Sequence, residues 1–267
     1  MIQLKESDRP TIEAYISAEP EMNLFFYGDL HNFNIGDGPV RIYALPGDTG
    51  WDALMLRFFD DFVVYSPDPG YDAGAVGAFL RQQEEVGCIS GKLECVAPLA
   101  PFFPAKTLEP TYMSRCNTPP AACPLPAGVT TRRMGAKDVE ELLDLLEEIE
   151  EFKSNPADGS RRSKQRQSML ANLEKGSLWY GVYEGERLVA TAQTSADNDQ
   201  SAMVVGVATR PGCRGKGYAS AVVSELCRSA FAAGRKFLCL FYHNPAAGRI
   251  YRRLGCEELG QYAMLQD

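Results

Sequence analysis

Apolar and polar positions in the second half of the chain follow the periods of amphipathic helices and short strands in turn. The clearest helix has apolar residues at i, i+3, i+4, i+7 and i+11 from Ala219, whereas 237–241 is a continuous apolar run typical of a strand buried on both faces. The predicted elements are, in order, a strand at 129–134, helices from Asp138 to about Phe152 and over 163–175, strands at 178–183, 188–194 and 202–209, a helix after Gly217, the strand 237–241, a helix from Asn244 to Gly255 and a strand at 257–265. This order predicts an α/β fold with a mixed central sheet and helices on both faces.

The first half has a similar but weaker pattern. It predicts a helix near 8–18, strands near 40–44, 53–58 and 62–66, a helix near 72–85, and then a further strand and helix. The order of elements resembles that of the second half, so we expect two related lobes in tandem. The first lobe departs from the second at the turn after its third strand, where Asp68 and Asp72 would repel a phosphate.

Four prolines between Asn117 and Pro126 interrupt the chain. Proline fixes φ and lacks an amide donor, so this segment cannot continue a helix or a central strand. We therefore expect an N-terminal α/β lobe at 1–116, a linker at 117–126 and a C-terminal lobe at 127–267.

Composition narrows the class of protein. The chain has 267 residues, 45% of them apolar and 23% charged, as soluble globular proteins have. Its net charge of −8 argues against nucleic acid as the main partner. The excess of acidic residues lies in 1–126, which has 8 basic and 17 acidic residues. Residues 127–267 have 19 basic and 18 acidic residues, so this half is the better host for an anionic ligand. No segment has the pattern of a membrane span or a signal peptide, so we expect a cytoplasmic protein without a membrane partner.

The eight cysteines do not form a metal motif. None are paired as C-x-x-C, and the two histidines, His31 and His243, lie far apart in the sequence. Zinc sites need clustered thiolates and imidazoles, so no metal is expected. We expect all eight cysteines to be reduced and to pack as small apolar side chains.

The sharpest local feature is the turn Arg214-Gly215-Lys216-Gly217, which lies between a strand and a helix. Two glycines allow a tight turn and leave no side chain between the backbone amides and a ligand. The unpaired amides at the helix start form an anion site, and Arg214 and Lys216 add positive charge. The turn fits neither the Walker A pattern nor the dinucleotide fingerprint. We therefore expect it to bind a phosphate of another kind of ligand.

Two motifs resemble the signatures of the GNAT superfamily of acyl-CoA-dependent N-acyltransferases. Arg214-x-x-Gly217-x-Ala219 matches the R/Q-x-x-G-x-G/A signature, and the strand end and proline at 207–211 precede it as in that family. Asn244-x-x-Ala247-x-x-x-Tyr251-x-x-x-Gly255 matches the second signature. The resemblance covers 129–267. One departure is Cys256, where the family usually has Phe, and there we expect only a change of packing.

The resemblance implies acetyl-CoA as the co-substrate and an amine as the acceptor. The amides of 214–220 would hold the diphosphate, and the strand through Val205, Val207 and Thr209 would diverge from 237–241 to receive the pantetheine. An amide near Val207 would polarise the thioester carbonyl. The implied cofactor-binding residues are Val205, Val207, Thr209, Arg214, Gly215, Lys216, Gly217, Tyr218, Ala219, Ser220, Asn244 and Ala247, and the implied general acid is Tyr251. The first lobe, without such a turn, would be a degenerate relative that holds no cofactor.

The chemistry also needs a proton acceptor, because an amine of pKa near 10.4 is only about 0.04% neutral at pH 7, a deficit of roughly 4.6 kcal/mol. The sequence leaves the base open. A desolvating pocket or a chain of waters could replace it. The candidate side chains are Glu147, Glu148, Glu150, Glu151, Asp197, Asp199 and His243.

The leading function is acetyl transfer to an amine by direct attack in a ternary complex. The alternative from another class is a non-catalytic module that senses acyl-CoA. The basic segment 161–166 offers nucleic-acid binding as a third interpretation, but no aromatic residues are interleaved there to stack on bases. The acceptor, the amine of a small molecule or of a peptide, stays unidentified, and both a monomer and a homodimer remain open.

Overall fold

The computed structural model describes residues 1–149, 152 and 159–267, and the chain forms two compact units. The first unit comprises Met1–Met113 together with Leu259–Asp267, and the second comprises Ser114–Glu258. The strands β6 (Thr107–Cys116) and β12 (Glu257–Gln266) each begin in one unit and end in the other. Each unit has a hydrophobic core of its own.

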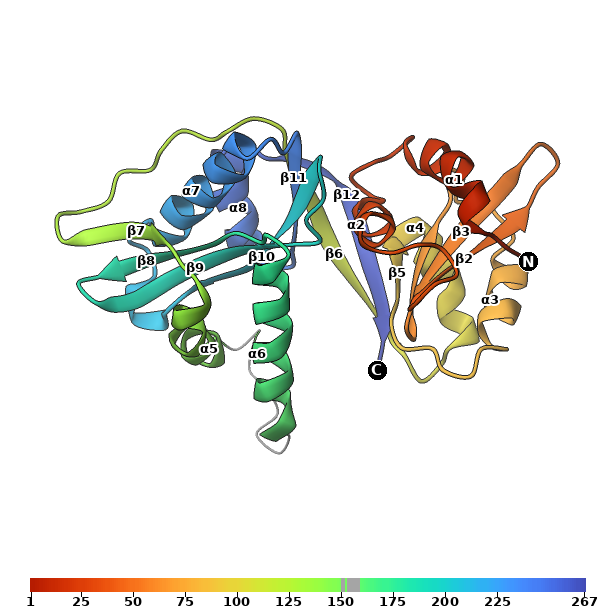
Figure 1. Cartoon of the computed structure of the whole chain (residues 1–267), viewed down its shortest axis with the longest axis horizontal. Coiled ribbons are helices and arrows are strands. Elements are labelled where there is room, and N and C mark those ends of the chain that lie inside the picture. The colour runs from red at the N-terminus through yellow and green to blue at the C-terminus, as the bar shows by residue number, and fades with distance from the viewer. Residues whose placement is uncertain (150–151, 153–158) are drawn as a thin grey trace. The chain divides into compact units, whose positions relative to one another are not determined.

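The second unit is a twisted sheet covered on both faces. Figure 1 shows α7 on one face of the strands and α5 and α6 on the other. The strands lie in the order β11-β10-β9-β8-β7, and the β10–β11 pair is parallel, whereas the three other pairs are antiparallel. The elements are β7 (Val129–Arg133), α5 (Val139–Glu147), α6 (Gly159–Glu174), β8 (Trp179–Glu184), β9 (Arg187–Ser195), β10 (Ser201–Thr209), α7 (Tyr218–Ala232), β11 (Phe237–Tyr242) and α8 (Pro245–Arg253).

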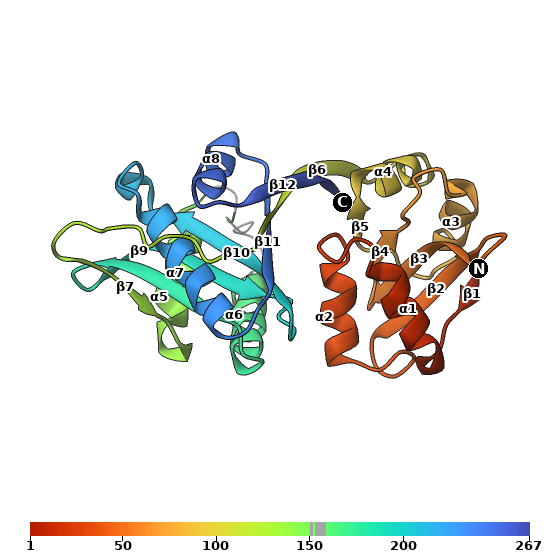
Figure 2. The same cartoon turned by 90° about the horizontal axis from the view of Figure 1, so that it is seen from above.

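The first unit repeats this order of elements. Its strands lie in the order β1-β2-β3-β4-β5, again with one parallel pair, β4–β5, after three antiparallel ones. Figure 2 shows α1 and α2 on one face and α3 and α4 on the other. The elements are β1 (Ile2–Gln3), α1 (Arg9–Ile16), α2 (Leu24–Asn32), β2 (Val40–Pro46), β3 (Trp51–Phe58), β4 (Asp61–Tyr65), α3 (Ala73–Leu80), β5 (Ile89–Lys92) and α4 (Leu93–Val96).

The predicted α/β fold class, a mixed sheet with helices on both faces, is confirmed in both units. In the second unit the apolar stripe of α7, which includes Val222, Val223 and Leu226, is fully buried against the sheet. The apolar side of α5 forms a second core on the opposite face. Two layers of apolar side chains therefore hold the sheet between the helices. The sequence pattern did not reveal α2 in the first unit, because its apolar residues are spread around the helix.

The unit boundaries differ from the predicted division at 1–116, 117–126 and 127–267. The proline-rich segment 117–126 has no regular structure, but it lies inside the second unit and not between the units. There the Ser224 hydroxyl donates a hydrogen bond of 2.7 Å to the Ala121 carbonyl oxygen, and Cys123 and Leu125 pack on the core. At the other end, residues 259–267 join the first unit, where Tyr262 to Leu265 of β12 pair with Lys92 to Ile89 of β5.

The expectation of eight reduced cysteines is wrong for one pair. Cys116 and Cys256 form a disulfide with a sequence separation of 140 residues. Cys116 ends β6 and Cys256 precedes β12, so the position where a packing change was expected carries a cross-link. The spacing in the sequence could not reveal this pair, because only the folded sheet brings the two residues together. The six other cysteines are free.

Candidate active site

The glycine turn lies where the sequence placed it, between β10 and α7. Gly215 and Gly217 have φ of +79° and +83°, the left-handed region that favours glycine, and a Cβ added at either would meet no atom within 4 Å. Backbone conformation, not crowding, therefore requires glycine here. The outer side of the turn is open space that a ligand can enter.

The start of α7 leaves its amides without an internal acceptor. Gly217 is the N-cap residue and no side chain caps the helix, and the first helical hydrogen bond, 3.0 Å long, runs from the Ala221 amide to the Gly217 carbonyl oxygen. The amides of 218–220 precede this bond and point out of the helix end. Together with the helix dipole they favour an anion at this position.

The two basic residues of the turn have different partners. The Arg214 Nε–H donates a weak 3.3 Å hydrogen bond to the Thr209 carbonyl oxygen. Lys216 instead forms an ion pair of 2.9 Å with Glu184 on β8, and the Tyr218 hydroxyl donates a 2.6 Å hydrogen bond to the same carboxylate. These two donors, Tyr218 first, lower the pKa of Glu184. Arg214 therefore remains available to a ligand, while Lys216 is engaged at the edge of the turn.

The strands β10 and β11 separate next to this turn. Their parallel pairing runs from Ser201 opposite Phe237 to Val204 opposite Leu240, the last pair of the register. Immediately afterwards β10 has a bulge against β9, with Gly206 at φ +60° and a register shift between Val205 and Ala208. A Cβ at Gly206 would lie 2.4 Å from the side-chain Nε2 of Gln193, which would have to move, and the positive φ itself favours glycine. A bulge re-aims the backbone, which here frees amides of β10 from the ladder.

A cavity of about 890 Å³ follows this gap from the turn to α8. Its size suits a ligand larger than a single phosphate. The hydroxyl of Thr209, which lines the cavity, is buried without a hydrogen-bond partner among the described residues. The candidate residues that line the cavity are Val207, Thr209, Arg214, Gly215, Gly217, Tyr218, Ala219, Ser220, Asn244, Ala247 and Tyr251. Val205 and Lys216 are not among its lining residues.

The helix α8 supplies the far wall of the cavity. Asn244 is its N-cap residue, and the Asn244 side-chain oxygen accepts a 2.8 Å hydrogen bond from the Ala246 amide. This bond uses the oxygen and leaves the NH₂ group of Asn244 as the donor for a ligand. Close packing fixes the helix, because a Cβ at Gly248 would lie 2.5 Å from the Tyr242 ring.

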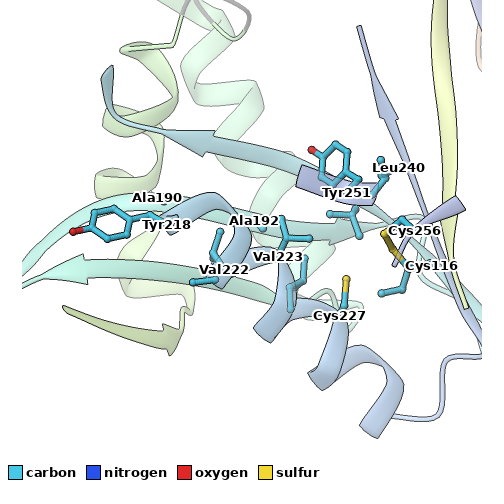
Figure 3. Packing of buried hydrophobic residues seen from close by; sticks show 14 of the residues in the cluster. Cys116, Ala190, Ala192, Tyr218, Val222, Val223, Cys227, Leu240, Tyr251 and Cys256 are labelled. Atoms are coloured by element: carbon cyan, nitrogen blue, oxygen red, sulfur yellow. A yellow bond between two sulfur atoms is a disulfide. The ribbon is translucent and has the colours of Figure 1, made fainter. Parts of the chain in front are cut away.

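Tyr251 combines burial with access to the cavity. It is 4% exposed and packs in the core, with its ring centroid 5.7 Å from that of Tyr242. Figure 3 shows its hydroxyl pointing away from the Cys116–Cys256 disulfide. Burial, and then the neighbouring Cys227 and Tyr242, raises the pKa of Tyr251 to about 12. The phenol is therefore protonated at neutral pH and can donate a proton or a hydrogen bond.

The carboxylate candidates for a base do not line the cavity in the part of the chain that the structure describes. Glu147 pairs with Arg162, and Glu148 pairs with the buried guanidinium of Arg210. Asp197 accepts hydrogen bonds from Ser177 and Arg235, and Asp199 does not line the cavity either. Glu150 and Glu151 lie outside the described residues.

His243 is the remaining candidate, and it does line the cavity, directly before Asn244. An imidazole changes charge near neutral pH, which suits proton transfer from an amine. The sequence offered His243 as one possibility among seven. The structure separates it by position from the four described carboxylates, Glu147, Glu148, Asp197 and Asp199, none of which lines the cavity.

Two arginines of the basic segment 161–166, Arg162 and Arg166, pair with the acidic side of α5. Arg162 forms ion pairs with Glu140, Asp144 and Glu147, with nitrogen–oxygen distances of 2.7–3.0 Å. Arg166 pairs with Glu140 at 2.8 Å. These partners neutralise both arginines within the unit, which is the pattern of a helix pair and not of an open basic patch.

The described ranges contain neither a group of metal ligands nor a helix that could span a membrane. No group of three or more His, Cys, Asp or Glu residues is arranged there to hold a metal ion. Within the same residues, every helix is too short or too polar to cross a bilayer.

The family comparison agrees with this geometry. The model of the acetyltransferase (GNAT) family matches residues 139–256, a range that includes the turn, the strand gap and α8. The second unit therefore contains a GNAT acetyltransferase domain. Acetyl transfer that depends on acetyl-CoA is typical of this family. No curated protein matches the chain.

Solved structures resemble the chain over nearly its whole length. A Drosophila melanogaster protein has a TM-score of 0.71 at 12% identity, covering 100% of this chain and 98% of its own. A GCN5-related N-acetyltransferase from Sphaerobacter thermophilus has a TM-score of 0.64 at 19% identity, and the match covers 99% of this chain and 94% of that protein. A tandem GNAT protein from the clavulanic acid biosynthesis pathway has a TM-score of 0.60 at 12% identity, and the match covers 99% of this chain and 96% of that protein. At these identities the likeness shows the fold, which is two GNAT-like lobes in tandem.

Proposed function

We propose that this protein transfers an acetyl group from acetyl-CoA to the amine of an acceptor by direct attack in a ternary complex. The observation that carries the proposal is a single cavity that combines three features: the open amides of 215–220, the gap between β10 and β11, and the Tyr251 ring. The order of these features along the cavity suits a long ligand with a diphosphate at one end and a thioester at the other.

The residues divide the binding task among them. The amides of 215–220 and Arg214 would hold the diphosphate through charge-assisted hydrogen bonds. The Asn244 NH₂ group and the backbone of 205–209 would hold the pantetheine, with Ala247 as an apolar wall. Val205 and Lys216 are carried by the family resemblance alone, since neither lines the cavity.

Acetyl-CoA supplies an acyl group that is activated as a thioester, and the protein would supply the proton transfers. An amide near Val207 would donate to the carbonyl oxygen as negative charge develops there. Tyr251 would donate to the sulfur as the carbon–sulfur bond breaks and the carbon–nitrogen bond forms. His243 would accept the proton that the amine loses. The products are coenzyme A thiol and the N-acetylated amine.

The first unit would be a lobe without a cofactor. Its turn between β4 and α3 has no open amide cluster like that of 215–220, and Asp72 caps α3.

Tyr251→Phe tests the proposal. It should lower turnover about 100-fold or more, because general acid catalysis typically contributes that much. The dissociation constant of acetyl-CoA should stay within about twofold, because the ring and its packing remain. Release of coenzyme A thiol in the presence of an amine panel measures turnover, and calorimetry measures binding. Equal turnover in both proteins would reject Tyr251 as the acid.

The pH profile adds a second readout. A pKa of about 12 means that Tyr251 keeps its proton at every pH well below that value, so its ionisation cannot shape the rate near neutrality. Tyr251→Phe should therefore lower the height of the profile and leave its shape unchanged. If the wild type binds acetyl-CoA but releases no thiol with any amine, the protein is a non-catalytic acyl-CoA sensor instead.

A further inference from the structure

Three arginines crowd the last turns of α8 beside the cavity. Arg249, Arg252 and Arg253 surround a hollow of about 350 Å³, and Arg253 also lines the main cavity together with Arg214, Gly215 and Gly217. Arg253 therefore belongs to the lining of both, and the arginine cluster borders the cavity. Like charges three or four residues apart on a helix repel each other, so an anion beside this cluster would be stabilised.

Two of these arginines have no acidic partner among the described residues. Arg252 lies 3.7 Å from the Glu258 carboxylate. The Arg253 Nε–H donates a 3.3 Å hydrogen bond to the Arg249 carbonyl oxygen, which leaves the terminal nitrogens of Arg253 to a ligand. Arg249 and Arg253 are four residues apart in α8, so they lie on one face of the helix.

The dipole of α8 explains part of this arrangement but not all of it. Basic residues near a helix C-terminus are favourable, which accounts for arginine at this end. It does not account for Arg253 lining the same cavity as the glycine turn. A planar guanidinium pair beside an anion-binding turn is suited to a second phosphate group.

We propose that Arg249 and Arg253 bind the ribose 3′-phosphate of coenzyme A, so that the protein selects free coenzyme A thioesters over donors that lack this group. The inference rests on the proposed function, since it places the diphosphate at the turn. Donors that lack the phosphate include dephospho-coenzyme A and a phosphopantetheine carried on a protein.

Calorimetry on the full chain tests the proposal with coenzyme A and 3′-dephospho-coenzyme A as probes. The wild type should bind coenzyme A about tenfold or more tightly than the dephosphorylated form. In Arg249→Ala/Arg253→Ala the affinity for coenzyme A should fall to that for dephospho-coenzyme A, whose own affinity should stay within about twofold. Arg228→Ala, which removes an exposed arginine that pairs with Glu225 on α7, should change neither affinity.

The outcomes separate the inference from the proposed function. Equal binding of both probes by the wild type would overturn the inference and leave the diphosphate site intact. Equal weakening of both probes in the double variant would also overturn it, since the arginines would then act on a group that the two ligands share. Failure of the wild type to bind either probe would overturn the proposed function as well. Retained binding of dephospho-coenzyme A by the double variant verifies its fold.

Discussion

The helices α3 and α7 occupy the same place in the two units, after the third strand of the repeated order, yet they begin in opposite ways. Asp72 caps α3, and its carboxylate accepts a 2.9 Å hydrogen bond from the Ala75 amide. Gly217 begins α7 without a side-chain cap. At the start of α3 a carboxylate of the chain itself accepts a hydrogen bond from a free amide. At the start of α7 no side chain does so, and the amides stay open to an external anion.

The space behind the two turns differs in the same sense. In the first unit the Tyr71 hydroxyl donates a 2.6 Å hydrogen bond to the Cys95 carbonyl oxygen, and the buried Ser66 hydroxyl bonds within the turn to the Asp68 carbonyl oxygen. In the second unit the corresponding space is the cavity lined by Asn244 and Tyr251. The comparison teaches that one scaffold can carry an open cavity or a filled core, depending on a few side chains at one turn.

The largest expected effect concerns the disulfide, which among the described residues only the second unit has. Cys116→Ala/Cys256→Ala should lower the free energy of unfolding by about 4 kcal/mol, because the disulfide closes a loop of more than 100 residues in the unfolded chain. Urea unfolding in the absence of reductant measures the change. Reductant should destabilise the wild type and leave the double variant unaffected. The denatured wild type should show six reactive thiols, and a count of eight would contradict the cross-link.

The next prediction converts the second turn into the first. Gly217→Asp places a carboxylate at the N-cap of α7, where it can accept from the Ser220 amide as Asp72 accepts from Ala75. Coenzyme A affinity should fall about 100-fold, because the carboxylate occupies the amides and repels the diphosphate. Calorimetry measures the affinity.

Gly217→Ala is the matched control for that variant. It carries the same strain at φ +83° without the charge, so both variants should lose a similar stability of about 1 kcal/mol. The affinity loss should be much larger in Gly217→Asp. If the two variants bind coenzyme A equally, the turn's shape matters and its open amides do not.

The elements of the second unit could be predicted from sequence because each one is long, periodic and bounded by a stop signal. Asn244 with Pro245 begins α8 and Gly255 follows it, and Gly217 precedes α7, as the residue types require. The position of the glycine turn could be predicted for the same reason, since it depends on local backbone conformation. These features are properties of short segments.

The features that could not be predicted depend on residues far apart in sequence. The disulfide between Cys116 and Cys256, and the passage of β12 into the first unit, are set by how the sheets assemble. The capture of Lys216 by Glu184 joins residues 32 positions apart, and the sequence showed only that Lys216 was basic and near the turn. A local motif therefore identifies a candidate residue but not the partner that withdraws it from the site.

A smaller effect is expected from opening the first turn. Asp72→Ala should lower the free energy of unfolding by about 1 kcal/mol, the usual value of a lost N-cap. Asp48→Ala, which removes an exposed carboxylate outside any helix start, should leave stability nearly unchanged. Coenzyme A should still bind with one site per chain, because Tyr71 and Cys95 still fill the space behind the turn. A second site per chain in Asp72→Ala would mean that the cap alone closes the first lobe.

The smallest effect concerns the acidic residue that remains beside the second turn. Glu184→Gln should tighten coenzyme A binding about twofold at low salt, because Lys216 loses its ion pair and one negative charge leaves the neighbourhood of the diphosphate. Glu186→Gln removes an exposed charge two residues away and should have less effect. Both effects should fade as salt increases. Weaker binding in Glu184→Gln would show instead that Glu184 supports the turn through its hydrogen bond with Tyr218. The carboxylate would then stabilise the site and would not compete with the ligand for Lys216.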